Sequence, residues 1–493
     1  MIFLISILTS FLLGILLCKI LFKEFANYAP RFLVNSSIPI GIGVSSIIFI
    51  VFNLLGVSTL FVILIEIVFI LFLLYKYGNP FKSIIKNTLE NKIFSINTLA
   101  KNPLLLLLVI VYFYSLLLDI GVYYFDSVKE PHGLWDAWAD WNLGAKMIGR
   151  DPVNWPDSFH QLVSEDFHTD YPLLQKGYIA RCWILLKNET VWIPIAFSFI
   201  FTFCAIGLLS AAVSYFTNKI QGLIAGLILL CTPFFMLLGD SQYADNTVGY
   251  FFLASIVLLT LARKDSATKP GLLIASGLTA GLAAWSKNEG LLFIVCLLTS
   301  QLTLLFFKNP KELFTEVKYL IIGMLPILAL IIYQKIAISP PNQIVVGQGP
   351  QTLIKIKDFS RYEIIWSWYK EQFVIFGQWA FNPWWLFLLG ILFKGGISIK
   401  KYSYSFIANV TWLILMLVGF FIVEIITPLD LVFYLSTSLH RLFAQLFPSF
   451  IFIYFVALKN NSTVISIPNG RTRKQNGRTL KNFKLSKIFK RTD

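Results

Sequence analysis

The chain is poor in charged residues. They make up 14% of its 493 residues, against about 25% in a typical soluble protein, while hydrophobic residues make up 57% and mean hydropathy is +0.72. Many apolar runs reach about 18 residues or more, which is the length that crosses the hydrocarbon core of a bilayer. This composition excludes an ordinary soluble domain and predicts an all-α polytopic membrane protein.

The sequence also lacks the signatures of several enzyme and binding classes. It has no Walker-type phosphate loop, no Gly-rich nucleotide fingerprint and no HExxH zinc motif. Its five cysteines have no short-range pairing and lie in or beside apolar runs, so we interpret them as packing residues. The net charge of +15 comes from short loops and the C-terminal tail, as the positive-inside rule expects. No basic stretch is interleaved with stacking aromatics, so nucleic acid is not predicted as a partner.

The apolar runs predict about 13 transmembrane helices. The first is expected to be an uncleaved span with its N-terminus outside, and lysine-bearing short loops place the segment 126–189 on the extracytoplasmic face. The predicted spans are 2–20, 33–54, 57–76, 103–124, 190–216, 221–239, 246–262, 271–285, 290–307, 319–337, 378–393, 404–426 and 440–457.

The order of spans and loops predicts four regions. Residues 1–102 form accessory transmembrane helices with a cytoplasmic loop, and residues 103–337 form a catalytic transmembrane core with the acidic outer loop 126–189. Residues 338–458 form a C-terminal transmembrane region with a second outer loop. The polar, basic residues 459–493 are predicted to be a disordered cytoplasmic tail.

The stretch EPHGLWDAWADWN, residues 130–142, concentrates aromatic and acidic side chains in an otherwise apolar chain. Asp136 and Asp140 are four residues apart and share a face if this stretch is helical. Trp135 begins a series of three tryptophans at intervals of three, which is typical of a helix lying at the membrane interface. The tryptophans are equally explained as an aromatic belt, whereas Asp136, just after a span, suits a general base.

Three further polar groups are predicted to reach the same outer face. Asp245 follows an outward span and is either a functional carboxylate or an N-cap of the next helix. Lys287, in WSKNEG, is either a binding group for an anionic headgroup or part of a solvated turn. Arg441 begins the last span beside His440, where a cation at the outer end indicates an anionic partner or a snorkelling side chain.

The outer histidines and aspartates raise a metal site as a candidate. Asp136, Asp245 and His168 carry ligand atoms that a divalent ion accepts, although their spacing matches no zinc motif. No cofactor is assigned from the sequence beyond this candidate metal ion.

At these residues the sequence resembles the GT-C glycosyltransferases, in particular the bacterial Rgt-type and ArnT-like branch. The resemblance covers residues 103–307 and 433–447. It places Asp136 and Asp245 at two acidic positions of the family, Tyr171 in an aromatic-proline element, and Lys287 at a basic position after a glycine-rich helix. The matching stretches are GLWDAWADWNLGAKMIGRDP, HTDYPLLQKGYIARCW, SQYADNTVGYFFLA and GLTAGLAAWSKNEGLLF. The chain departs from the family in having Ala137 where a second acid is common, and in three spans that precede the core.

The resemblance implies an inverting glycosyltransferase of the bacterial inner membrane. Its partners would be a polyprenyl-phosphate-linked sugar donor, a glycan, lipid or protein acceptor, and membrane lipids. It implies catalytic roles for Asp136 and Asp245. The residues expected to bind substrate are Lys287, Arg441, Asp140, Trp135, Tyr171 and His440.

Two alternatives stay open from the sequence. A polysaccharide polymerase or ligase would centre on an arginine in a late outer loop, where Arg361 lies. A transporter or flippase of lipid-linked saccharide would place ionisable groups inside spans, and Glu66 and Glu424 are the main such residues. The long polar outer loops favour an enzyme.

Overall fold

The computed structural model describes residues 2–22, 28–82, 84–85, 99–159, 167–264, 269–342, 349–398 and 403–459. Residues 1–459 form one compact unit. The predicted basic tail lies outside the described residues from 460 onward, as does the 160–166 part of the acidic outer loop. The predicted division into four regions stays a prediction.

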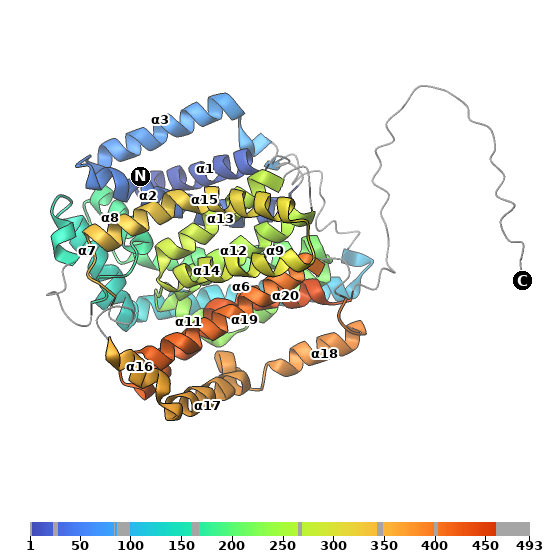
Figure 1. The fold of residues 1–493 in the computed structure, drawn as a ribbon. Coiled ribbons are helices and arrows are strands. Elements are labelled where there is room, and N and C mark those ends of the chain that lie inside the picture. The colour runs from blue at the N-terminus through green and yellow to red at the C-terminus, as the bar shows by residue number, and fades with distance from the viewer. Residues whose placement is uncertain are drawn as a thin grey trace, which may run out of the picture. The chain divides into compact units, whose positions relative to one another are not determined.

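The described residues are almost entirely helical, and their one strand-like feature is an isolated bridge between Ile397 and Leu458. The helices are α1 (Ile2–Leu21), α2 (Pro30–Leu54), α3 (Thr59–Tyr77), α6 (Pro103–Lys129), η2 (Ala137–Trp141), α7 (Asn142–Arg150), η3 (Trp155–Phe159), α8 (Leu174–Leu186), α9 (Trp192–Phe216), α10 (Lys219–Leu230), α11 (Pro233–Asp240), α12 (Asp245–Lys264), α13 (Lys269–Ser286), α14 (Glu289–Leu302), η5 (Thr303–Phe306), α15 (Pro310–Ala337), α16 (Pro350–Lys357), α17 (Phe359–Ile375), η6 (Phe376–Gln378), α18 (Trp384–Lys394), α19 (Ser403–Ile426) and α20 (Leu431–Ala457) (Figure 1).

Short polar residues begin several of these helices. Asn102, Asn218, Asn309 and Asp430 each accept a hydrogen bond from a backbone N–H in the first turn of α6, α10, α15 and α20. Such caps satisfy N–H groups that have no partner within the helix, and they fix where an apolar segment starts.

Each of the 13 predicted spans overlaps a helix, but not all of these helices are long. Among the described residues, nine helices are long and apolar enough to cross a membrane, and a tenth span results if the bent pair α10–α11 is counted as one. α1, α13 and α18 contain shorter apolar stretches. The all-α polytopic membrane fold is therefore confirmed, whereas the number 13 stays a prediction.

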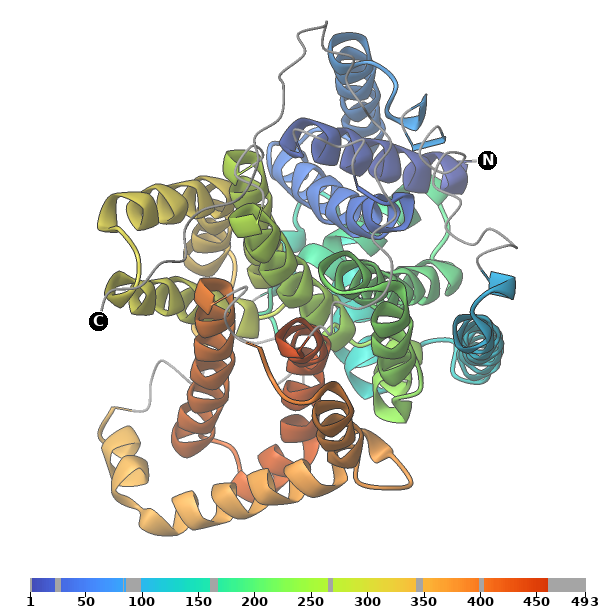
Figure 2. The same cartoon turned by 90° about the vertical axis from the view of Figure 1, so that its right-hand side faces the viewer.

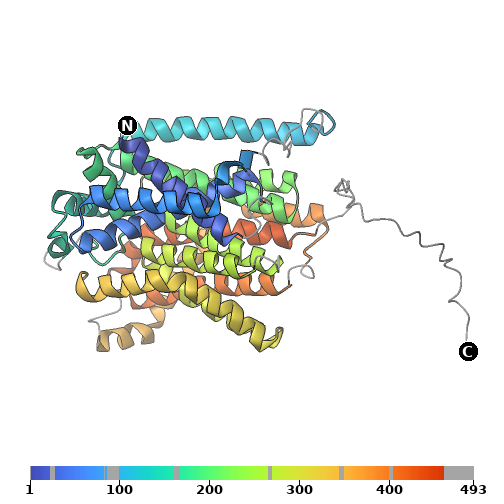
Figure 3. The same cartoon turned by 90° about the horizontal axis from the view of Figure 1, so that it is seen from above.

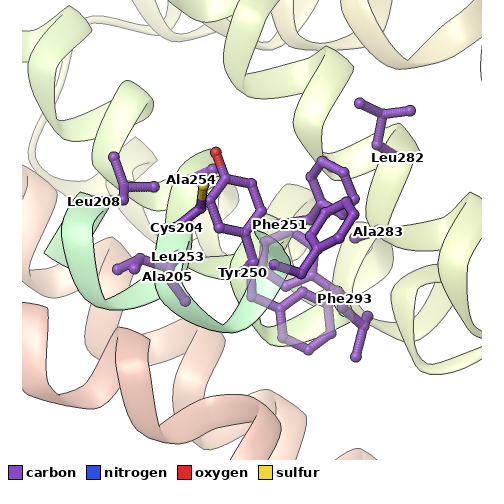
Figure 4. Packing of buried hydrophobic residues seen from close by; sticks show 14 of the residues in the cluster. Cys204, Ala205, Leu208, Tyr250, Phe251, Leu253, Ala254, Leu282, Ala283 and Phe293 are labelled. Atoms are coloured by element: carbon purple, nitrogen blue, oxygen red, sulfur yellow. The ribbon is translucent and has the colours of Figure 1, made fainter. Parts of the chain in front are cut away.

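The centre of the unit is α12. Every residue of its apolar window is buried, and it packs against α9, α13 and α20. Figure 4 shows Tyr250 and Phe251 of α12 beside Phe293 of α14 and the α13 residues Leu282 and Ala283. A helix that is apolar on all sides belongs in such a core, because no face of it needs lipid or water.

Other helices lie at the margin. α6 runs along one edge of the unit (Figure 3), and only 6% of its apolar window is buried, as expected for a helix that faces lipid. α1 and α2 pack side by side on one flank, and α17 and α18 lie on another (Figure 2). These marginal helices leave α12, α13 and α20 to build the centre.

The α10–α11 pair bends by 62° at a break between Leu230 and Pro233. Proline has no backbone N–H to continue the α10 ladder, so the chain changes direction there. α11 then ends at Asp240, and a short turn leads directly into Asp245 at the start of α12. The bend thus brings this turn close to the segment that follows α6.

Candidate functional site

A buried carboxylate lies at the centre of the candidate site. Asp245 Oδ1 accepts hydrogen bonds from Lys287 Nζ at 3.1 Å and from Gln445 Nε2 at 2.7 Å. Its Oδ2 accepts from Arg441 Nη2 at 2.8 Å and Nε at 3.2 Å. Its side chain is fully buried. Three side chains from two other parts of the chain therefore neutralise and hold this one carboxylate, as a buried charge requires.

Close packing of α20 on α12 makes these contacts possible. Gly249 lies one turn after Asp245, and a Cβ at this position would meet the backbone of Gln445 at 3.0 Å. Glycine therefore lets α20 approach α12 closely, as small residues do in membrane helix pairs. Arg441 and Gln445 are four residues apart on α20, so both face Asp245.

Asp136 reaches the same arginine from the stretch 130–142. Gly133 adopts a positive φ of 72°, and a Cβ there would meet the Ser241 carbonyl oxygen at 2.5 Å. Glycine tolerates both conditions, and the Leu134 N–H then donates to that carbonyl at 3.2 Å. The π-helical turn η2 starts after Asp136, whose Oδ2 accepts from Arg441 Nη2 at 2.5 Å. The Asp136 side chain keeps 22% of its surface exposed.

Lys287 is buried, so the solvated-turn alternative is wrong for this side chain. Its ammonium lies 2.9 Å from Glu289 Oε1 as well as 3.1 Å from Asp245. Burial alone would lower the pKa of Lys287, but the two carboxylates outweigh that effect and raise it. Lys287 is therefore held as a cation beside Asp245.

Asp140 has a different partner from Asp136. Its Oδ1 accepts from Lys176 Nζ at 2.8 Å, and both side chains are buried. Burial raises the pKa of Asp140, and the ion pair with Lys176 opposes that rise. The lysine ammonium also lies 4.9–5.5 Å from the ring centroids of three surrounding aromatics, Trp141, Phe159 and Phe167. The predicted binding role of Asp140 stays a prediction, and its observed contact anchors η2.

Tyr171 and His168 form a stack beside this anchor. The Tyr171 ring stacks with the ring of Trp141, 5.4 Å away, and with that of His168, 4.7 Å away. The neighbouring Asp170 Oδ2 accepts from Asn288 at 2.8 Å and from Asn342 at 2.6 Å. Because Asn288 follows Lys287, these bonds connect the loop before α8 to the turn that carries Lys287.

The Asp170 contacts predict a pH-dependent stability. Burial by itself would raise the pKa of Asp170, but Lys335 and the two asparagines hold it below the ordinary value. A carboxyl with a lowered folded pKa stabilises the fold above its unfolded pKa of about 3.9 and loses that stabilisation as pH falls through the folded value. We expect the melting temperature of the detergent-solubilised protein to fall below about pH 4. Asp170→Asn should flatten this part of the profile, and an unchanged profile would refute the assignment.

The remaining predicted residues are less centrally placed. The Trp135 ring is exposed and packs edge-on against Trp138 at 4.6 Å, which fits the aromatic-belt alternative. The His440 ring packs on Phe234 at 4.8 Å. Their predicted roles in substrate binding stay predictions.

The candidate metal ligands do not form one donor set in the part of the chain that the structure describes. No group of three or more His, Cys, Asp or Glu side chains there is arranged to hold a metal ion. Asp136 and Asp245 instead direct their oxygens at Arg441 and Lys287. These carboxylates fit cationic side chains, and we derive no step through a metal.

Four residues that were not predicted from the sequence also belong to the site or to its anchor. Gln445 and Glu289 complete the hydrogen bonding around Asp245 and Lys287, and the Tyr243 ring lies 4.5 Å from the Arg441 guanidinium carbon. The four-residue spacing of Gln445 from Arg441 could have indicated that Gln445 shares a helix face with Arg441. No sequence pattern indicated Lys176, because a lysine within a helix does not show which residue it pairs with.

Two residues named in the ligase and transporter alternatives have partners within the protein. Arg361 donates to the backbone carbonyls of Glu424 at 3.1 Å and Ile425 at 2.9 Å, which caps the end of α19. Glu66 of α3 forms a buried ion pair with Arg181 of α8. The capping arginine gives no support to the ligase alternative, and the helix-docking pair of Glu66 gives none to the transporter alternative, whose second residue, Glu424, is buried within α19.

Part of the chain is similar to a known protein family. Residues 172–334, from the loop before α8 to α15, match the family model described as dolichyl-phosphate-mannose-protein mannosyltransferase, a family of the GT-C superfamily. Neither the curated proteins nor the solved structures contain a match to the chain. The matched segment includes Asp245 and Lys287 and ends before Arg441. Together with the polytopic helical fold, this match over about one third of the chain confirms the predicted resemblance to the GT-C glycosyltransferases.

Proposed function

We propose that the protein transfers a sugar from a polyprenyl-phosphate donor to a hydroxyl group of an extracytoplasmic glycan, lipid or protein acceptor. The observation that supports this proposal is the contact of Arg441 with both Asp136 and Asp245, beside Lys287. A partly exposed carboxylate next to two fixed cations suits a reaction that needs both a base and an anion site.

Asp136 is the proposed general base. Its side chain is the more exposed of the two aspartates on Arg441, so an acceptor hydroxyl can approach it. The hydroxyl gives its proton to the Asp136 carboxylate as its oxygen bonds to the anomeric carbon of the donor. The bond from that carbon to the phosphate oxygen breaks, and its electron pair stays with the polyprenyl phosphate.

Arg441 and Lys287 are the proposed binding groups for the departing phosphate. Charge on that phosphate grows as the glycosidic bond breaks, and fixed cations stabilise it more in the transition state than before. Asp245 is then a positioning residue, because it holds both cations through its two oxygens.

Inversion of the anomeric carbon follows from the same arrangement. A retaining reaction needs a second carboxylate that is free to bond to the sugar. Asp245 is buried and bound by three side chains, which makes it a poor nucleophile. A single displacement with Asp136 as base is therefore proposed.

The donor and the location follow from the predicted topology. Nucleotide sugars are cytoplasmic, whereas the site is proposed to face the outside of a bacterial inner membrane, so a lipid-linked donor is the consistent choice. Tyr171, Trp135 and His440 are proposed contacts for sugar or lipid. The test is mass spectrometry of envelope glycans after deletion of the protein. Loss of one sugar substituent is expected, and an unchanged glycan profile together with no transfer from any polyprenyl-phosphate sugar would refute the function.

Lys287→Ala is expected to weaken use of the donor. Loss of one charge-assisted contact to phosphate should raise the donor KM by about tenfold or more. Initial rates in proteoliposomes at varied lipid-linked sugar measure this effect. Lys129→Ala, at the exposed end of α6, is the control and should leave KM unchanged. An unaltered donor KM in Lys287→Ala would remove Lys287 from the anion site.

A further inference from the structure

We propose that Arg441 holds the base Asp136 in a closed ion pair until a lipid phosphate binds, so that Asp136 becomes free only when the donor is in place. This inference rests on the proposed function and adds an order of events to it. Donor binding opens the pair, acceptor binding follows, and departure of polyprenyl phosphate closes the pair again.

The two carboxylates on Arg441 are held unequally. Asp245 receives both Nε and Nη2 of the guanidinium, together with Lys287 and Gln445, and it is fully buried. Asp136 meets the guanidinium through Nη2, and part of its side chain is exposed. A competing anion therefore displaces Asp136, because Asp245 has three partners to lose and no access to water.

The charges of the cluster favour that displacement. Three carboxylates, Asp136, Asp245 and Glu289, surround the two cations Arg441 and Lys287. A phosphate brings further negative charge and matches the planar fork of an arginine better than a single carboxylate oxygen does. The cluster cannot keep every anion in contact with Arg441, and the exposed Asp136 is the one that can move into solvent.

The closed pair keeps Asp136 from acting as a base when no donor is bound. While the pair is closed, Asp136 Oδ2 accepts from Nη2, and the guanidinium compensates the negative charge that Asp136 needs to take a proton from a hydroxyl that approaches its exposed side. After transfer, the proton on Asp136 leaves through its exposed side. The same contact therefore resets the base after each turnover.

Carboxylate labelling tests the gate without a transfer assay. The reconstituted full chain is treated with a carbodiimide and an amine, with and without undecaprenyl phosphate, and labelled peptides are quantified by mass spectrometry. Undecaprenyl phosphate is expected to raise labelling of Asp136 by about tenfold, the order of change that loss of one charge-assisted hydrogen bond produces. Undecaprenol, which lacks the phosphate, should have no effect.

Glu189 provides a matched internal control. Its carboxylate forms a bidentate pair with Arg150 at 2.6 and 2.8 Å, and the pair is not part of the site. Labelling of Glu189 should rise in Arg150→Gln and should not respond to undecaprenyl phosphate in the wild type. This control establishes that carbodiimide labelling increases when a carboxylate is released from an arginine.

Variants of Arg441 complete the test. Arg441→Gln should label at Asp136 strongly before lipid is added and should not respond to it. If Arg441→Gln does not fold, Arg441→Lys replaces it, because a single ammonium cannot bridge both carboxylates as the fork does, and labelling should start at an intermediate level.

The outcomes separate the two proposals. If undecaprenyl phosphate binds, as measured by retention of radiolabelled lipid, and Asp136 labelling stays level or falls, the gate is refuted while the lipid-phosphate site stands. If the lipid is not retained at all by wild-type protein, the proposed donor class fails, and the gate fails with it.

Discussion

Asp136→Asn is expected to lose between about 100-fold and 10 000-fold of the transfer rate, because that is the range that a positioned general base contributes. The asparagine keeps the size of the side chain and can still meet Arg441, but it cannot accept the proton of the acceptor hydroxyl. Binding of the lipid-linked donor should persist, so the loss should appear in kcat more than in donor KM. Proteoliposomes supplied with a polyprenyl-phosphate sugar provide the measurement.

Asp157→Asn is the matched control for that experiment. Asp157 lies in η3 of the same acidic loop and is exposed, so its loss of charge tests for a general electrostatic effect of the loop. Its transfer rate should equal that of the wild type. Full activity in Asp136→Asn, with expression and melting temperature unchanged, would remove Asp136 from the role of base.

Glu66→Gln is expected to destabilise the protein by about 3–5 kcal/mol, the usual result of removing one partner from a buried ion pair. Glu66 and Arg181 are both buried, and Arg181 also donates to Ser6 Oγ at 2.6 Å and Thr9 Oγ1 at 3.2 Å. Those neutral hydroxyls solvate the guanidinium without neutralising it. The change should therefore loosen the docking of α1 and α3 on α8, measured as a drop in unfolding free energy in detergent.

A second variant separates loss of the pair from loss of charge balance. Glu66→Leu combined with Arg181→Met removes both charges and should recover most of the stability, because apolar side chains of similar size often replace a buried pair without loss. Glu189→Gln breaks the exposed pair with Arg150, whose side chains are 33% and 66% exposed, and should cost about 1 kcal/mol or less. Equal effects of Glu66→Gln and Glu189→Gln would contradict the docking role.

Much of the fold could be predicted from the sequence, because membrane insertion is governed by local apolar length. The helices α2, α9, α12 and α19 follow apolar runs that any residue-by-residue reading finds. The break at Pro233 was not predicted, since the apolar run from 221 to 239 reads as one straight span. Hydropathy averaged over this run does not register Pro233, whose missing backbone N–H ends the α10 hydrogen-bond ladder.

The candidate site was predicted in part. Asp136, Asp245, Lys287 and Arg441 were expected on one face, and the structure brings all four into direct contact. The sequence could not show which of these residues contact each other, because Asp136 and Arg441 are 305 residues apart. Their contact depends on the close approach of the turn at Gly133 to Ser241 and of α20 to α12 at Gly249.

By itself the sequence determined that this protein is a polytopic helical membrane protein in which one loop stretch, residues 130–142, concentrates acidic and aromatic residues. Apolar length and loop charge suffice for that, since each is a property of a single segment. Only the tertiary structure decided that Asp140 pairs with the buried Lys176, that Gln445 completes the cluster, and that Asp136 keeps an exposed side. Burial and pairing of charge are properties of several segments at once, so they become defined only when the helices pack.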